Sequence, residues 1–212
     1  MHLLRQLDYR MHYLSDPQAI YRRSFDILTA ETNFSGLPRE AICIAQRLVH
    51  ACGMPEITED LRATENIAQA ASLALASGRP IFADCTMVKS GIMIDRLAHK
   101  NKVICTLPST SPKKNMTRSA AAVDAWKPNL LGSVIAIGNA PTALFRLLEI
   151  LQEGGPRPAA IFGFPVGFVG AAEAKEALAT IKHGIPFMTL KGRRGGSAMA
   201  AAAVNAIILD TQ

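Results

Sequence analysis

The sequence is poor in aromatic residues: its 212 residues include one tryptophan, three tyrosines and eight phenylalanines. No run of lysine or arginine is interleaved with them, so a platform that stacks single-stranded nucleic acid is not expected. The sequence also lacks an unbroken apolar run of about 20 residues, the length that a membrane-spanning helix needs. We therefore predict neither a nucleic-acid partner nor a membrane.

Cysteine is also scarce, and the four thiols are Cys43, Cys52, Cys85 and Cys105. No two of them have the C-x-x-C spacing, and no two histidines have metal-ligand spacing, so no metal site is expected. No signal peptide is visible, and a chain of this length buries enough core to fold without disulfides. We therefore expect reduced thiols and a cytoplasmic protein.

Apolar residues make up 49% of the chain and charged residues 19%, with 23 Lys+Arg against 17 Asp+Glu. The net charge of +6 fits nucleic acid, lipid headgroups or an acidic small molecule, and composition does not choose among them. No linker, low-complexity tract or fixed-period repeat interrupts the chain. We therefore expect residues 1–212 to form a single domain.

The N-terminal third has helical periodicity, with helices predicted over residues 18–31, 39–52 and 65–77. Asp16 followed by Pro17 is typical of a helix start. Gly53 and Gly78 are typical of the position just past a helix end, and Thr64 is the expected cap of the third helix.

From residue 80 onward, short apolar runs alternate with helical stretches. The predicted strands lie within residues 80–84, 103–108, 132–138, 159–165 and 185–190, and the predicted helices span 118–126, 142–152, 171–181 and 198–209. Apolar strands that alternate with helices indicate a parallel sheet covered on both faces. The expected fold is a three-layer α/β/α architecture with a mostly parallel sheet of about five strands.

Ligands of such sheets bind beyond the carboxyl ends of the strands. Four segments of this chain meet there: DCTMVKSG, GNAPT, GFPVGFVG and KGRRGGS. Three of them are glycine-rich loops that lead into helices, so we expect free backbone N–H groups facing an anionic ligand. Neither G-x-x-x-x-G-K-[ST] nor G-x-G-x-x-G is present, which argues against an NAD-binding Rossmann enzyme.

His50 stands between apolar neighbours in the stretch QRLVHACGM. On a helix over residues 39–52 it shares a stripe with Cys43 and Arg47. Two cationic donors side by side predict an anionic partner, and an imidazole acts as a general acid near neutral pH. The alternative is a packed structural histidine. A Cys52 nucleophile activated by His50 is disfavoured, because side chains two residues apart on a helix diverge by about 200°.

Several blocks of the chain together resemble one enzyme family. They are DPQAIYRRSFDIL, RLVHACG, TRSAAAVDAW, GSVIAIGNAPTALFRLLE, PVGFVGAAEAKEAL and KGRRGGSAMAAAAVNA. The chain is similar to precorrin-8X methylmutases of cobalamin (vitamin B12) biosynthesis from about residue 13 to residue 208. The segment before Tyr13 shows no such likeness.

The resemblance implies an isomerase that moves a methyl group from C-11 to C-12 of precorrin-8X and yields hydrogenobyrinate. It also implies a homodimer without metal or organic cofactor, and a polycarboxylate corrinoid as substrate and product. The catalytic residue it implies is His50, in VHACG. The substrate-binding residues it implies are Ser24, Arg47, Thr86, Arg118, Asn139 and Arg193, and it implies no role for Arg194.

A flat macrocycle fringed with carboxylates fits the cationic excess, and Met87, Val88 and the GFPVGF loop offer apolar cover for its ring. Two related functions stay open. One is the methylmutase of the anaerobic branch, which acts on cobalt-precorrin-8, although VHACG resembles the cobalt-free enzyme more. The other is a carrier that binds a corrinoid without turnover.

Overall fold

The computed structural model describes residues 13–210, and a six-stranded sheet forms its centre in the order β1-β6-β5-β4-β2-β3. The strands are β1 (Leu61–Ala63), β2 (Ile81–Ala83), β3 (Val103–Ile104), β4 (Val134–Ile137), β5 (Ala160–Gly163) and β6 (Phe187–Leu190). All neighbouring strands from β6 to β3 pair in parallel. The predicted five parallel strands and the α/β class are thus confirmed.

The sixth strand, β1, was not predicted from the sequence. It pairs antiparallel with β6, with Leu61 opposite Leu190 and Ala63 opposite Met188. Three residues are too few to show alternation, so the pairing partner makes this segment a strand. Thr64 continues along β6, where its Oγ1 accepts a hydrogen bond from the N–H of Phe187 at 3.0 Å. Thr64 is therefore not the helix cap that the sequence predicts.

The long helices match the prediction, and they are α1 (Pro17–Glu31), α2 (Ile42–Cys52), α3 (Ile67–Ala76), α5 (Arg118–Asp124), α6 (Pro141–Gln152), α7 (Ala171–Thr180) and α8 (Ser197–Asp210). One short helix was missed, α4 (Thr86–Gly91). Five 3₁₀ turns complete the described elements: η1 (Arg39–Ala41), η2 (Pro55–Glu59), η3 (Ile94–Arg96), η4 (Leu107–Ser109) and η5 (Lys127–Asn129). The carboxylate of Asp16 caps α1, and Gly53 ends α2 with a φ of 68°.

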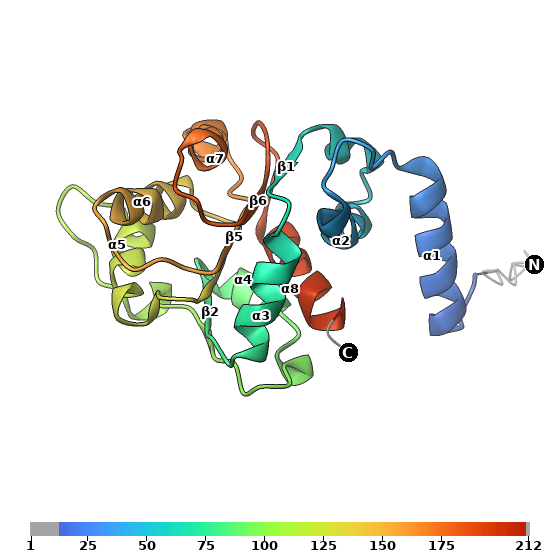
Figure 1. Ribbon diagram of the computed structural model, residues 1–212, viewed down its shortest axis with the longest axis horizontal. Coiled ribbons are helices and arrows are strands. Elements are labelled where there is room, and N and C mark those ends of the chain that lie inside the picture. Colours follow the sequence, from blue (N-terminus) through green and yellow to red (C-terminus); the bar gives the residue numbers. More distant parts are fainter. Residues whose placement is uncertain (1–12, 211–212) are drawn as a thin grey trace, which may run out of the picture.

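The helices cover both faces of the sheet, which gives the expected three layers (Figure 1). Helices α2, α3, α4 and α8 share one apolar core with the sheet, whereas α5, α6 and α7 share the other. Helix α8 packs between α2 and α4, and nearly all of its side chains are buried. Its apolar sequence is therefore explained by burial in its own subunit and gives no evidence of a partner.

Helix α1 lies at one side of the molecule and packs against α2 (Figure 1). Among its residues only Leu28 is buried, whereas Ile20 and Ile27 are exposed. The side chains that touch α2 include Tyr21 and Phe25, one turn apart. Within residues 13–210, no helix is both long and apolar enough to cross a membrane.

Candidate active site

His50 lies in the last turn of α2 and is exposed. Its imidazole stacks on the ring of Phe25 from α1, with ring centroids 5.1 Å apart and an angle of 26° between the planes. Among the described residues no hydrogen bond to the imidazole occurs, so both ring nitrogens are available to a ligand. This environment differs from that of His183, which is buried and hydrogen-bonded to the carbonyl of Leu178 at 2.9 Å.

Cys52 does not form a nucleophile with His50. Its thiol donates to the carbonyl oxygen of Val49 at 3.7 Å, away from the imidazole. Burial raises the pKa of the Cys52 thiol, which favours the unreactive protonated form. Both observations agree with the sequence argument against a Cys52 nucleophile activated by His50.

Arg47 lies one turn before His50 on the same helix. Its guanidinium is 4.8 Å from the ring centre of Phe25 and 5.2 Å from that of Tyr21, and it donates a hydrogen bond to the Tyr21 hydroxyl. No carboxylate of residues 13–210 pairs with it. A guanidinium has five N–H donors, so most of them remain for an anionic ligand.

A hollow of about 270 Å³ opens beside His50 between α1 and α2. Its lining residues are Ser24, Ile27, Leu28, Glu31, Val49, His50, Gly53 and Pro55. Pockets that enclose a drug-sized ligand measure about 300–1,000 Å³. The hollow beside the imidazole and the Ser24 hydroxyl is slightly smaller than that range, so a ligand larger than drug size needs a further surface.

The other expected binding residues lie at the carboxyl ends of the strands. Thr86 begins α4 after β2, and Asn139 follows β4; both are exposed. Arg118 begins α5, and the adjacent Thr117 hydroxyl donates to Thr142 of α6 at 2.8 Å. The starts of α5 and α6 therefore lie side by side at this edge.

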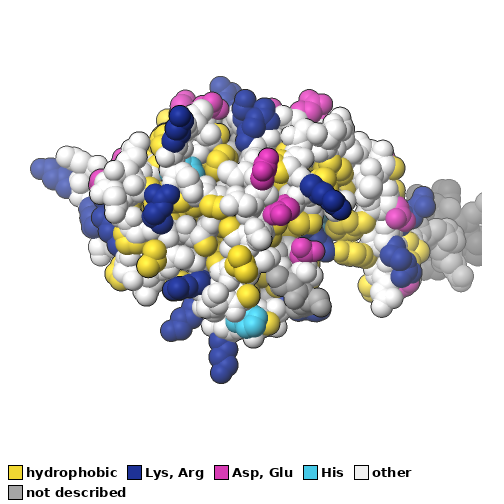
Figure 2. All heavy atoms as spheres, viewed as in Figure 1, with side chains coloured by type: hydrophobic (Ala, Val, Ile, Leu, Met, Phe, Trp, Pro, Cys, Tyr) yellow, Lys and Arg dark blue, Asp and Glu magenta, His cyan; other side chains and the backbone are white. Residues whose placement is uncertain are grey.

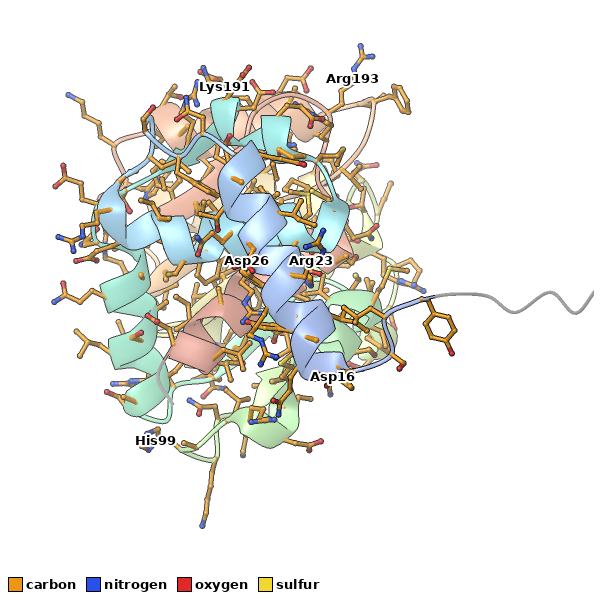
Figure 3. The ribbon with its side chains drawn as sticks, turned by 90° about the vertical axis from the view of Figure 1, so that its right-hand side faces the viewer. Asp16, Arg23, Asp26, His99, Lys191 and Arg193 are labelled. Carbon is orange, nitrogen blue, oxygen red and sulfur yellow. The ribbon has the colours of Figure 1, made fainter. Side chains whose placement is uncertain are left out.

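Arg193 lies in the loop between β6 and α8 and extends outward from the molecule (Figure 3). Its guanidinium is 5.3 Å from the ring centre of Phe168, which belongs to the loop after β5. Phe168 is 84% exposed and its neighbour Val169 is 89% exposed. An exposed cation next to exposed apolar side chains fits a ligand that is apolar in its centre and acidic at its rim.

The structure therefore divides the expected site residues into two sets. We call Ser24, Arg47 and His50 the histidine set, and Thr86, Arg118, Asn139 and Arg193 the strand-end set. Within the described part of the chain, no hydrogen bond, ion pair or ring contact joins the two sets. Helices α1 and α2 lie on one side of the molecule, and α5 and α6 on the other (Figure 1).

Asp84 is a structural determinant of the strand-end set that the sequence reading did not single out. Asp84 is 2% exposed, and its carboxylate accepts hydrogen bonds from the N–H groups of Gly138, Asn139 and Ala140, at 3.0, 2.9 and 2.8 Å. Burial raises the pKa of Asp84, and the three N–H donors lower it in part. In the sequence, Asp84 could have been found as an acidic residue directly after a buried strand.

These hydrogen bonds correct one expectation about the GNAPT loop. Its backbone N–H groups were expected to face a ligand, but three of them bind Asp84 instead. A ligand carboxylate at this loop therefore has to bind to side chains such as that of Asn139 and not to these three backbone N–H groups. Asp84 fixes the backbone from which that side chain extends.

Arg194 holds the GRRGGS loop in place. Its guanidinium pairs with Asp60 at 2.7 Å and with Glu56 at 3.3 Å, and its carbonyl accepts a hydrogen bond from Lys175. Burial, with Arg194 nearby, lowers the pKa of Lys175 to about 8. Adjacent arginines thus differ: Arg194 pairs within the protein and Arg193 faces outward.

The same loop approaches the backbone closely at Gly195. A Cβ at Gly195 would collide with the carbonyl oxygen of Phe164, so this close approach requires glycine.

The basic residues do not gather into a nucleic-acid interface on the face seen in Figure 2, where Lys and Arg side chains are scattered among apolar ones. Within residues 13–210, no three His, Cys, Asp or Glu side chains are close enough together to hold a metal ion.

Several known proteins are similar to this chain along most of its length. The precorrin-8X methylmutase of Pseudomonas aeruginosa is 50% identical over 205 residues, which cover 94% of this chain and 99% of that protein. That of a Sinorhizobium species is 50% identical over 200 residues, covering 92% and 95%. The cobalt-precorrin-8 methylmutase of Priestia megaterium is 36% identical over 197 residues, covering 90% and 87%.

A solved structure shares the fold. The precorrin-8X methylmutase of Thermus thermophilus superposes with a TM-score of 0.82 at 33% identity, covering 92% of this chain and 96% of that one. A family model described as precorrin-8X methylmutase matches residues 19–209. Because the match covers the α1–α2 pair, the sheet and the strand-end loops alike, this chain belongs to the precorrin-8X methylmutase family.

Proposed function

We propose that this chain is the isomerase that converts precorrin-8X into hydrogenobyrinate in cobalamin biosynthesis. The observation that carries the proposal is the environment of His50. Its imidazole is exposed and stacked on Phe25, and within residues 13–210 it has no hydrogen bond and the neighbouring Arg47 has no carboxylate partner. The two relatives at 50% identity are named for the cobalt-free substrate, and the cobalt-precorrin-8 enzyme of Priestia megaterium is 36% identical. Residues 1–212 act as one domain in the cytoplasm, where thiols stay reduced.

In the proposed reaction the bond between C-11 and the methyl group breaks while the bond between C-12 and the methyl group forms. His50 donates a proton or a hydrogen bond to the ring system and so makes the methyl shift easier. Because substrate and product are isomers, any proton that His50 gives to the macrocycle is returned within the same turnover. An imidazole suits both steps near neutral pH, and the reaction requires no cofactor and no methyl donor.

The direct test is to incubate the purified protein with precorrin-8X and record the visible spectrum. Appearance of the hydrogenobyrinate spectrum over many turnovers supports the isomerase. A spectral shift that stops at one equivalent of corrinoid per site would instead identify a carrier. Parallel reactions with cobalt-precorrin-8 separate the two branches, and faster turnover of the cobalt-containing substrate would contradict the assignment made here.

Arg47, Arg118 and Arg193 are proposed to bind carboxylates of the corrinoid. Replacing any one of them by glutamine is expected to raise KM about 10-fold or more, because a charge-assisted hydrogen bond contributes about 1.5–3 kcal/mol. Lysine is expected to substitute poorly wherever the contact is bidentate, and affinity is expected to fall with salt. Steady-state kinetics at two ionic strengths measure both effects. Salt-independent affinity with all three glutamine variants at wild-type KM contradicts this arrangement.

The working enzyme is proposed to be a homodimer in which two subunits complete each site. Among the described residues no contact joins the histidine set to the strand-end set within one subunit, and the hollow beside His50 is smaller than the ligand requires. In a two-fold dimer, a residue of one subunit meets a different residue of its partner, and the same contact occurs twice. The histidine set of each subunit can thus face the strand-end set of the other. Phe168 and Val169, both highly exposed, are suited to such a contact.

Sedimentation equilibrium at micromolar concentration is expected to give twice the chain mass of 22.8 kDa. A fully active species at 22.8 kDa contradicts the dimer. Coexpression of His50→Ala with Arg118→Gln tests whether sites are shared. The assay is run at substrate concentrations well below KM, where Arg118→Gln alone is expected to keep about a tenth of wild-type activity or less. If each site combines both sets from two subunits, mixed dimers keep one intact site and the mixture regains about a quarter of wild-type activity. No recovery with confirmed mixed dimers would place both sets in one subunit.

A further inference from the structure

The two polar residues of α2 that face the ligand are held by aromatic rings of α1. Tyr21 and Phe25 are four residues apart and so lie on one face of α1, and Arg47 and His50 are three apart on α2. We propose that Phe25 is a positioning residue for His50 and Tyr21 a positioning residue for Arg47. This inference rests on the proposed role of His50 in the isomerisation.

Phe25 lies at the centre of this cluster. Its ring centre is 4.7 Å from that of Tyr21, 5.1 Å from that of His50 and 4.8 Å from the Arg47 guanidinium. The interplanar angle of 26° with His50 describes a stacked pair, whereas the Tyr21 ring is tilted by 30°. One side chain of α1 thus contacts both functional groups of α2.

The direction in which a histidine delivers a proton is set by the plane of its ring, because both nitrogens lie in that plane. In most catalytic histidines one ring N–H donates a hydrogen bond to a carboxylate or carbonyl oxygen, and this bond fixes the ring. His50 has no such bond among the described residues. The Phe25 ring covers one face of the imidazole and leaves its edge uncovered, so stacking takes over the orienting function.

Arg47 is oriented by two different contacts. The Tyr21 hydroxyl accepts a hydrogen bond from one of its N–H groups, and the guanidinium lies over the rings of Tyr21 and Phe25. Cation–π contacts of this kind contribute about 0.5–1 kcal/mol at exposed sites. These contacts fix the orientation of the remaining guanidinium N–H groups before the ligand binds, so less conformational entropy is lost on binding.

The two positioning residues are expected to affect different kinetic constants. Phe25→Leu removes the ring and keeps apolar contact, so we expect kcat to fall about 10- to 100-fold, as misplacement of a reacting group does. KM is expected to rise only about 2- to 5-fold, from the lost contact with the Arg47 guanidinium. Tyr21→Phe removes the hydroxyl alone and is expected to raise KM about 3- to 10-fold with kcat unchanged. A purely structural role would lower thermal stability without this division between kcat and KM.

The experiment measures kcat, KM and Tm with precorrin-8X for Tyr21→Phe, Phe25→Leu, Phe25→Tyr and His50→Ala. Phe25→Tyr keeps the ring and is expected to restore kcat to within about 3-fold of wild type. Asp26→Asn changes the neighbouring exposed residue of α1 and serves as the matched control, with wild-type kinetics expected. If Phe25→Leu does not fold, Phe25→Met replaces it, because methionine fills the space without a ring.

Wild-type kcat in Phe25→Leu, or equal losses in Phe25→Leu and Phe25→Tyr, would overturn the positioning role of Phe25. Unchanged KM in Tyr21→Phe overturns that of Tyr21. These outcomes are distinct from failure of the proposed function, in which His50→Ala itself keeps near-normal kcat. Loss of turnover in His50→Ala together with full activity in Phe25→Leu refutes the inference and leaves the role of His50 intact.

Discussion

Replacing His50 by alanine is expected to lower kcat by about 10²–10⁴-fold, the usual contribution of a general acid, while folding and corrinoid binding persist. The imidazole is exposed and makes no hydrogen bond within residues 13–210, so its removal opens no core cavity and leaves no buried partner unsatisfied. The expected Tm is therefore close to that of the wild type. Turnover spectra, equilibrium binding of the corrinoid and thermal unfolding measure the three quantities.

His99→Ala is the matched control, since His99 is also an exposed histidine and lies away from α1 and α2 (Figure 3). It is expected to turn over precorrin-8X at the wild-type rate. A near-normal kcat in His50→Ala would return that residue to a structural role, and a similar loss in both variants would point to a general effect of removing a histidine.

Replacing Asp84 by alanine is expected to cost about 3 kcal/mol or more of unfolding free energy. The change leaves the buried N–H of Gly138 and the partly buried N–H groups of Asn139 and Ala140 without their acceptor. An unsatisfied buried donor costs about 1–3 kcal/mol, and the two partly buried donors add to that cost. Asp84→Asn is expected to lower the free energy of unfolding by less than Asp84→Ala does. Its amide oxygen still accepts a hydrogen bond, although its amide N–H₂ cannot accept one from the remaining N–H donors. Urea unfolding measures the loss as a lower midpoint at unchanged slope.

Asp124→Asn is the control for removing a carboxylate. Asp124 is more exposed and pairs with Arg146 at 2.8 Å and Lys113 at 3.3 Å, and these pairs lower its pKa. Partly exposed ion pairs contribute about 0–1 kcal/mol, so this variant is expected to remain much more stable than Asp84→Ala. Equal losses in the two variants would show that the three N–H contacts of Asp84 contribute little.

The sequence predicts the sheet well because its parallel strands are buried on both faces and read as short apolar runs, as IFA and VIAI do. Strand β1 is not predicted in this way, since Leu61–Ala63 has no apolar run or alternation of its own and is a strand because it pairs with β6. Helix α4 is similarly too short for periodicity to appear. Local sequence thus predicts the elements that are long or fully buried.

The candidate site divides in the same way. Family resemblance indicates His50, Arg47 and the strand-end residues, because their motifs are distinctive in sequence. Phe25 lies within DPQAIYRRSFDIL and Asp84 within DCTMVKSG, but neither segment indicates what these two side chains contact. The contact of Phe25 with His50 depends on how α1 lies against α2, and that of Asp84 with residues 138–140 depends on the neighbouring positions of β2 and β4. Tertiary packing creates both contacts, so propensity and periodicity do not reveal them.

Burial of α8 also has a consequence for synthesis of the protein. Helices α2 and α4 leave the ribosome early, yet the apolar surface they bury is supplied by residues 197–210, which are translated after all six strands. A chain without α8 exposes the faces of α2 and α4 to solvent and to other nascent chains, and such surfaces favour aggregation. Helix α2, which carries His50, therefore cannot complete its packing until residues 197–210 have been synthesised.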